Sequence, residues 1–186
     1  MNIYLTGYRC TGKTSLGKKL AESMGIHFID ADVYLTDKYN TTISDMVSSH
    51  GWDYFREKEG TILKEISSLE NHVIATGGGV ILRKENVTLM KETGIVIWLR
   101  ATPETIKKRI VQDETTEESR PSLTSRGLLD EIEETLNQRS PIYEESMNFA
   151  IDTDSMAIST LHSMIVKQLK DRNLPCLEAT LEKHLK

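Results

Sequence analysis

The 186-residue sequence is poor in cysteine and aromatic side chains, and it contains no long apolar run. Its two cysteines, Cys10 and Cys176, form neither a disulfide framework nor a metal-binding spacing, so we expect a reducing, cytoplasmic location. No apolar stretch approaches the ~18 residues that a membrane span needs. The first residues lead directly into a strand pattern, so we expect no targeting segment and no membrane association.

Positive charge is also scarce, because 23 basic residues face 28 acidic ones and leave a net charge of −5. A surface that binds nucleic acid is usually basic, so nucleic acid is not an expected partner. The Asn-Lys-x-Asp pattern typical of guanine-nucleotide switches does not occur in the sequence. With 38% hydrophobic and 27% charged residues, the chain has the composition of one globular domain, and we expect a monomer.

Apolar runs typical of buried strands alternate with helical patterns along the chain. The runs lie at about residues 2–6, 26–29, 73–76, 95–99 and 149–152. The run at 95–99 is apolar throughout, as strands of parallel sheets tend to be. The alternation predicts an α/β fold in three layers, with a mainly parallel five-stranded sheet flanked by helices.

A glycine-bounded segment, Gly7-Tyr8-Arg9-Cys10-Thr11-Gly12-Lys13-Thr14, follows the first strand and leads into a helix. The glycines let the backbone turn its N–H groups inward, and the helix N-terminus adds further donors and a positive dipole end. In a loop of this kind Lys13 bridges the outer phosphates and the Thr14 hydroxyl binds Mg²⁺. The segment therefore predicts the binding of a nucleoside triphosphate.

Two more segments follow the carboxyl ends of strands, the edge at which open α/β sheets bind ligands. Asp30-Ala31-Asp32 follows the second strand, where one carboxylate can serve a metal and the other a substrate hydroxyl. Taken alone, such a pair is as often a turn or a helix cap. Gly77-Gly78-Gly79 follows the third strand, and it predicts either close approach of the backbone to a ligand or a flexible loop.

Residues 33–70 have a helical pattern that is broken near residues 39–41 and again near Gly51. The second part carries Phe55, Arg56 and Glu59. Arg56 and Glu59 are three residues apart and share a helix face, so spacing alone favours a solvated ion pair. On the same grounds, Phe55 is predicted to lie in the core.

Residues 112–125 are polar and aperiodic, and they contain Arg120 and Pro121. The segment is either a linker or a mobile lid that holds Arg120 over the phosphates. A helix predicted from about residue 128 to 145 carries Arg139, and its Pro141 predicts an irregular C-terminal half. The tail at residues 171–186 has leucines at every fourth residue and is interpreted as a short helix that packs on the body or on a partner.

Taken in order, these motifs resemble the shikimate kinase family from residue 1 to about residue 170. The motifs that carry the resemblance are the phosphate loop, Asp30-x-Asp32, Phe55-Arg56-x-x-Glu59, Gly77-Gly78-Gly79, Arg120-Pro121 and Arg139-x-x-x-Tyr143. The resemblance implies a single P-loop kinase domain at residues 1–170, with substrate-binding helices at about 33–70, a lid at about 112–125 and a separate tail. It also implies Mg²⁺-dependent transfer of the ATP γ-phosphate to the 3-hydroxyl of shikimate, a step toward aromatic amino acids.

The resemblance implies a role for each motif as well. The implied catalytic residues are Lys13, Asp32 and Arg120, and the implied Mg²⁺ ligands are Thr14 and Asp30. The implied ATP-binding residues are Gly7, Arg9, Cys10, Thr11, Gly12, Lys13, Thr14, Ser15, Arg109 and Arg120. The implied shikimate-binding residues are Asp32, Phe55, Arg56, Glu59, Gly77, Gly78, Gly79, Pro121 and Arg139.

Two alternatives remain open at this point. A gluconate kinase or a nucleoside monophosphate kinase would share the loop and the sheet, although Phe55-Arg56-x-x-Glu59 and the three glycines favour the shikimate interpretation. A nucleotide-binding protein without catalysis is less favoured, because it would be expected to have lost Lys13, Asp32 or the arginines, and all of these are present.

Overall fold

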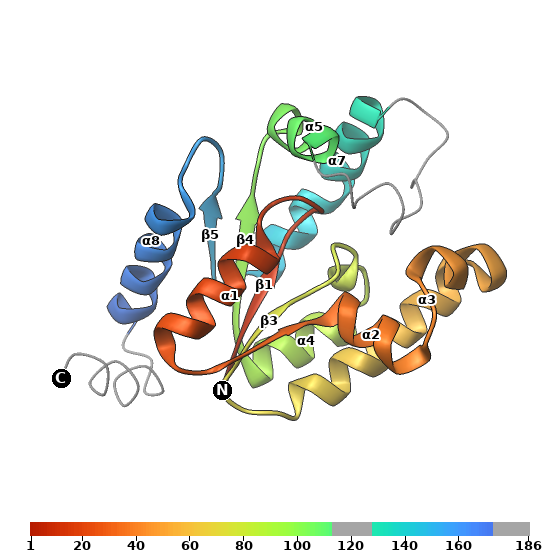
Figure 1. Ribbon diagram of the computed structural model, residues 1–186, viewed down its shortest axis with the longest axis horizontal. Coiled ribbons are helices and arrows are strands. Elements are labelled where there is room, and N and C mark those ends of the chain that lie inside the picture. Colours follow the sequence, from red (N-terminus) through yellow and green to blue (C-terminus); the bar gives the residue numbers. More distant parts are fainter. Residues whose placement is uncertain (113–127, 173–186) are drawn as a thin grey trace.

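The computed structural model describes residues 1–112 and 128–172 (Figure 1). In these ranges the strands form a five-stranded sheet in the order β2-β3-β1-β4-β5, and each pair of neighbours is parallel. The strands are β1 (Asn2–Thr6), β2 (His27–Asp30), β3 (His72–Ala75), β4 (Gly94–Arg100) and β5 (Phe149–Asp152). The helices are α1 (Lys13–Met24), α2 (Ala31–Tyr39), α3 (Ile43–Ser67), the short η1 (Val80–Leu82), α4 (Lys84–Thr93), α5 (Pro103–Gln112), α7 (Leu128–Ser146) and α8 (Ile158–Asp171).

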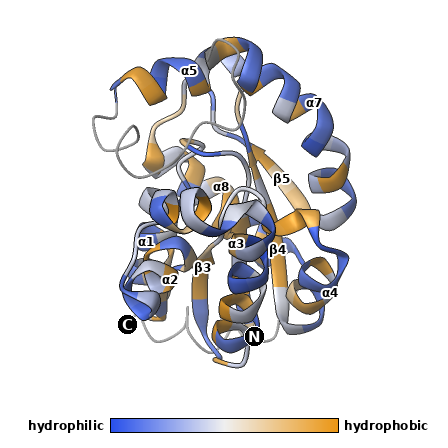
Figure 2. Ribbon diagram, turned by 90° about the vertical axis from the view of Figure 1, so that its right-hand side faces the viewer, coloured by the Kyte–Doolittle hydropathy of each residue, from blue (hydrophilic) through white to orange (hydrophobic). Residues whose placement is uncertain are grey.

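Helices cover both faces of the sheet, because successive side chains of a strand point to opposite faces. In β4, Ile95, Ile97 and Leu99 pack with α1 and α8 on one face. Val96 and Trp98 pack with α3, α4 and α7 on the other. Figure 2 shows the apolar residues on the strands and on the helix faces that cover them. The predicted three-layer α/β fold with a parallel five-stranded sheet is confirmed.

The register of the sheet brings three of the predicted motifs to one edge. Ala75, the last residue of β3, pairs with Asp30 of β2 on one side and with Leu5 of β1 on the other. The phosphate loop, Asp32 and the segment Gly77-Gly78-Gly79 therefore leave the sheet side by side at its carboxyl edge. This is the edge at which open parallel sheets bind their ligands.

The helical region at residues 33–70 breaks where the sequence predicted. Helix α2 ends at Tyr39, and its C-cap residue Asn40 has a left-handed φ of 48°. Helix α3 begins after Thr42, whose side chain accepts a hydrogen bond from the Asp45 backbone N–H. It kinks at Gly51, where φ is 81° and ψ is 172°. The second half of α3, beyond this kink, carries Phe55 and Arg56.

The predicted irregular C-terminal half of the helix near residue 145 is wrong. Helix α7 continues through Pro141 to Ser146. A proline inside a helix removes one backbone hydrogen bond, so tertiary packing has to compensate. Here Tyr143 is fully buried and stacks on Trp98 of β4, with 5.5 Å between the ring centroids.

The predicted lid, with Arg120 and Pro121, and the predicted tail helix beyond residue 172 lie outside the described residues. No helix in the described ranges is both long and apolar enough to cross a membrane.

The turn after β1 requires glycine for both backbone conformation and space. Gly7 has a φ of 136°, and a Cβ there would lie 2.4 Å from the backbone oxygen of Leu99. We expect Gly7→Ala to lower the free energy of unfolding by about 3 kcal/mol or more, because neither the strain nor the backbone clash can relax cheaply. Chemical denaturation measures this loss.

Gly12 is the matched control for this prediction. It also has a positive φ, 93°, but a Cβ there would meet no atom within 4 Å. Gly12→Ala therefore introduces strain without a clash, and we expect a loss of about 1–2 kcal/mol. Equal losses in the two variants would show that the contact with Leu99 is unimportant.

Candidate active site

Lys13 is hydrogen-bonded to the backbone of the phosphate loop. Lys13, the first residue of α1, is only 8% exposed, and its Nζ donates to the backbone oxygens of Gly7 at 2.9 Å and Tyr8 at 2.7 Å. The Thr11 hydroxyl donates to the same Tyr8 oxygen at 2.8 Å. No side chain caps the N-terminus of α1, whose N-cap residue is Gly12. The first N–H groups of the helix are therefore available to an anion.

Thr14 and Asp30 form a pair of oxygen ligands beside the loop. The Thr14 hydroxyl donates to Asp30 Oδ2 at 2.7 Å. Asp30 Oδ1 accepts from the backbone N–H of Asp32 at 3.1 Å and so caps α2, which confirms the helix-cap interpretation for this residue. Mg²⁺ in nucleotide sites binds one or two such protein oxygens, together with phosphate oxygens and water. The residues present fit this ion, although the described residues contain no cluster of three or more His, Cys, Asp or Glu side chains.

A cleft that is open to solvent lies on the outer side of the loop. It is lined by Cys10, Thr11, Gly12, Ser15, Leu16, Arg109, Thr153, Met156, Ile158 and Leu161. Arg109 of α5 donates to the backbone oxygen of Cys10 at 3.2 Å and to that of Thr153 at 2.6 Å, so its guanidinium forms one wall. Sequence reasoning missed Thr153 and Met156. Their position just after β5, at the carboxyl edge of the sheet, was the signal that could have identified them.

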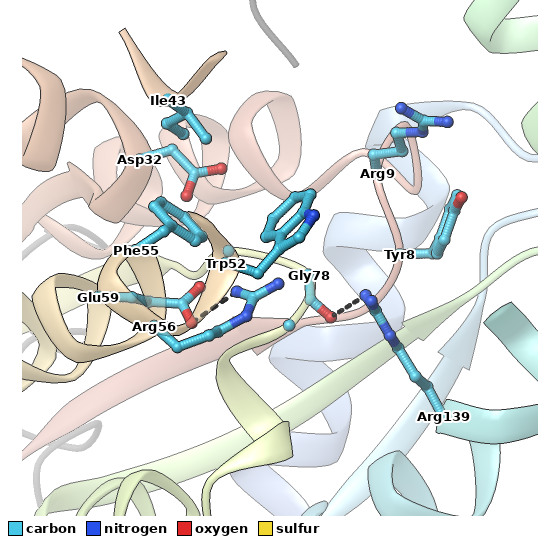
Figure 3. Close-up of a pocket in the computed structure, with 12 residues that line it drawn as sticks. Tyr8, Arg9, Asp32, Ile43, Trp52, Phe55, Arg56, Glu59, Gly78 and Arg139 are labelled. Atoms are coloured by element: carbon cyan, nitrogen blue, oxygen red, sulfur yellow. Dashed lines mark hydrogen bonds and ion pairs between the residues drawn. The ribbon is translucent and has the colours of Figure 1, made fainter. Parts of the chain in front are cut away.

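A second cleft opens on the inner side of the loop (Figure 3). The lining residues that the sequence predicted for the acceptor are Asp32, Phe55, Arg56, Glu59, Gly77, Gly78, Gly79 and Arg139. Tyr8, Arg9, Ile43 and Trp52 also line it and were not assigned to the acceptor. Trp52 could have been found, because it lies one helical turn before Phe55 and Arg56 and so shares their face. Arg9, which was predicted to bind ATP, is also among the residues that line this cleft.

The prediction of a solvated ion pair between Arg56 and Glu59 is wrong. Arg56 Nη1 lies 2.7 Å from Glu59 Oε2, and the side chains are only 14% and 5% exposed. Burial raises the pKa of Glu59, and the positive charge of Arg56 opposes that shift. The guanidinium also lies 5.3 Å from the Trp52 ring centroid and 4.9 Å from that of Phe55. Arg56 is therefore oriented in the cleft wall by a carboxylate and two aromatic rings.

Phe55 is buried in the core, as predicted, and lines the cleft as well.

Arg139 of α7 reaches the same cleft from the other side. Its Nη1 donates to the backbone oxygen of Gly78 at 3.2 Å, and the Tyr143 hydroxyl donates to the same oxygen. Burial raises the pKa of Tyr143, which keeps its hydroxyl protonated as a donor. Among the described residues, no ion pair involves Arg139. Its positive charge remains available to an anionic ligand.

Gly77 and Gly79 leave space for the charged groups of the cleft. A Cβ at Gly77 would lie 2.4 Å from Glu59 Oε1 and 2.8 Å from Asp32 Oδ1. A Cβ at Gly79 would lie 2.2 Å from Arg56 Nη2. The sequence predicted close approach of the backbone to a ligand at this segment, and the structure shows close approach to the charged side chains of the cleft.

Gly79→Ala should displace the Arg56 guanidinium without disturbing the fold, because the clashing atoms are the end of a flexible side chain. We expect KM for an acidic acceptor to rise about tenfold, since a charge-assisted hydrogen bond is weakened, while KM for ATP stays unchanged. Steady-state kinetics with each substrate varied in turn measures both constants. Unchanged KM values for both substrates would show that Arg56 does not need this space.

The glycine-bounded loop after β1, the sheet order and the two clefts define a P-loop kinase. The family model described as shikimate kinase matches residues 9–170. The chain belongs to the shikimate kinase family.

Relatives with curated names and solved structures agree with this assignment. The chain is 42% identical over 153 residues to a shikimate kinase of Caldicellulosiruptor bescii, which covers 82% of this chain and 86% of that protein. It is 34% identical over 170 residues to shikimate kinase 2 of Yersinia pestis, with 90% and 97% covered. The shikimate kinase from Acinetobacter baumannii in complex with shikimate is 32% identical and has a TM-score of 0.87, with 93% and 94% covered. These matches favour a shikimate kinase over the gluconate and nucleoside monophosphate kinase alternatives.

Proposed function

We propose that this protein phosphorylates the 3-hydroxyl of shikimate with ATP and releases ADP and shikimate 3-phosphate. The observation that carries the proposal is that Arg56, Arg139 and Asp32 line one cleft directly beside the phosphate loop. The family membership of the chain and the shikimate complex of the Acinetobacter relative support it.

Two guanidinium groups and a carboxylate would select and orient the acceptor. Arg56 and Arg139 would bind the shikimate carboxylate, because a guanidinium matches carboxylate geometry with paired hydrogen bonds. Asp32 would accept the hydrogen bond of the attacking hydroxyl and take its proton as the oxygen bonds to phosphorus. Glu59 acts indirectly in this scheme, by holding Arg56.

The phosphate loop would hold ATP from the other side. Lys13 would exchange its contacts with the loop backbone for contacts with the phosphates and neutralise charge during transfer. Arg109 would face the base, and Arg120, which lies outside the described residues, would add a second positive charge. Thr14 and Asp30 would hold Mg²⁺, which screens the phosphate charges when bound.

The proposal also includes the domain bounds, the oligomeric state and the cellular location of the protein. The kinase domain spans residues 1–170 with a lid at about 112–125, and residues 171–186 are a C-terminal tail. The protein acts as a monomer. Its low cysteine content is typical of a cytoplasmic protein.

A coupled assay of ADP release tests the proposal with shikimate, gluconate and nucleoside monophosphates as acceptors. We expect Mg²⁺-dependent turnover with shikimate alone. Efficient turnover only with gluconate or with a nucleoside monophosphate would contradict the proposed acceptor. ATP binding without turnover of any acceptor would favour a non-catalytic protein.

A further inference from the structure

The backbone oxygen of Gly78 accepts hydrogen bonds from two side chains of α7. Arg139 Nη1 donates to it at 3.2 Å, and the Tyr143 hydroxyl donates to it as well. Arg139 and Tyr143 are four residues apart and therefore lie on the same face of the helix. A phenolic oxygen that donates its proton keeps lone pairs, so it can also accept a hydrogen bond from a guanidinium. The two side chains are thus gathered around one carbonyl group.

Packing in the core fixes the place of the Tyr143 hydroxyl. The side chain is fully buried, and its ring lies at only 15° to the ring of Trp98. Burial raises the pKa of Tyr143, while the charge of Arg139 and a hydrogen bond with it oppose the shift. Tyr143 does not itself line the acceptor cleft, whereas Arg139 and Gly78 do. Any effect of the hydroxyl on a bound acceptor therefore passes through these two residues.

The two arginines of the acceptor cleft are held in different ways. They approach Gly78 from opposite sides (Figure 3). Arg56 is oriented by its ion pair with Glu59, but Arg139 has no ion pair among the described residues. An arginine side chain has many rotamers, and a site that needs one of them has to hold it there. For Arg139 the printed contacts that do so are with the Gly78 carbonyl and the Tyr143 hydroxyl.

Gly78 in turn is packed against the backbone of the phosphate loop. A Cβ at Gly78 would lie 3.3 Å from the backbone oxygen of Gly7 and 3.6 Å from the backbone nitrogen of Arg9. The carbonyl that Arg139 and Tyr143 share therefore belongs to a residue in direct contact with the loop. An acceptor held by Arg139 is placed relative to the phosphates through this residue.

We propose that Tyr143 is a positioning residue of the acceptor site, whose hydroxyl holds the Arg139 guanidinium at the Gly78 carbonyl and so orients it for the carboxylate of the acceptor. The inference rests on the proposed function, in which Arg139 binds the shikimate carboxylate. Tyr143 touches no substrate and exchanges no proton. It strengthens binding because a guanidinium that is already oriented loses less conformational entropy when the carboxylate arrives.

Tyr143→Phe tests this role, because it removes the hydroxyl and keeps the ring that stacks on Trp98. We expect KM for shikimate to rise about fivefold, the effect of one lost neutral hydrogen bond, while kcat and KM for ATP change less than about twofold. Steady-state kinetics with each substrate varied in turn measures the three constants.

Tyr4→Phe is the matched control. Tyr4 is also fully buried in the core on the same face of the sheet, and its hydroxyl lies 2.7 Å from that of Thr93. Tyr4 lines neither of the two clefts described above. We expect both variants to lose about 2–4 °C in Tm, since each loses one buried hydrogen bond. Only Tyr143→Phe should change KM for shikimate.

A double-mutant cycle with Arg139→Ala shows whether the hydroxyl acts through the guanidinium. Once Arg139 is replaced, Tyr143→Phe should change KM for shikimate less than about twofold. A fivefold effect that persists without Arg139 would overturn the inference, and so would an unchanged KM for shikimate in Tyr143→Phe alone. A Tyr143→Phe protein that does not fold would assign the hydroxyl to stability and overturn it as well. Absence of shikimate turnover in the unchanged protein would instead contradict the proposed function, and this inference with it.

Discussion

Lys13→Ala is expected to lower kcat about 10²–10³-fold, because a preorganised positive charge at the transferred phosphoryl group is lost. The structure adds a second expected effect. Lys13 Nζ bonds to the backbone oxygens of Gly7 and Tyr8, so its loss leaves two loop carbonyls without this donor. We therefore expect a lower Tm as well. Single-turnover kinetics with saturating ATP separates the chemical step from weaker nucleotide binding.

Lys18→Ala is the matched control for this prediction. Lys18 is an exposed lysine on the same helix, one turn and a half beyond the loop. Its replacement should leave kcat unchanged, which excludes a general effect of charge removed from α1. Near-normal turnover by Lys13→Ala would contradict the proposed phosphoryl-transfer mechanism.

Arg139→Ala is expected to raise KM for shikimate about 30–100-fold and to leave KM for ATP nearly unchanged, because paired charge-assisted hydrogen bonds to the acceptor carboxylate are lost. Among the described residues Arg139 has no ion-pair partner, so its removal leaves no uncompensated carboxylate in the cleft. A large loss of stability is therefore not expected. Initial rates with shikimate varied at saturating ATP, and the reverse, measure the two constants.

Arg100→Ala provides the comparison for an arginine outside the clefts. Arg100 is 42% exposed and pairs with Asp152, and exposed pairs of this kind contribute little to stability. Both KM values should stay unchanged in this variant. If Arg139→Ala weakened ATP and shikimate equally, Arg139 would not be an acceptor ligand, and the cleft would need another assignment.

The sequence was sufficient to predict the features that depend on residues close together in the chain. The loop from Gly7 to Thr14, its place between a strand and a helix, and the breaks near Asn40 and Gly51 were predicted from the sequence and are present in the structure. Each depends on residues that are neighbours in the chain. Glycine permits left-handed backbone conformations, and alternating apolar runs bury the strands.

Predictions from local spacing were wrong where the burial of a side chain decides its environment. Arg56 and Glu59 looked like a surface pair because spacing on a helix does not reveal which face is covered. In the structure the pair is buried in the cleft wall, against the segment from Gly77 to Gly79. Pro141 likewise predicted an irregular C-terminal half of α7, but stacking of Tyr143 on Trp98 holds the helix against the sheet.

The sequence by itself determined the class of chemistry, because the phosphate loop and each of the family motifs are short runs of residues that can be recognised along the chain. Only the tertiary structure decided which charges are paired and which remain for a ligand. It paired Arg9 with Glu131 and Arg56 with Glu59, and it left Arg139 without an ion pair among the described residues. The physical reason is that the energy of a charge depends on its burial and on its partners, and both come from residues that are distant in the chain.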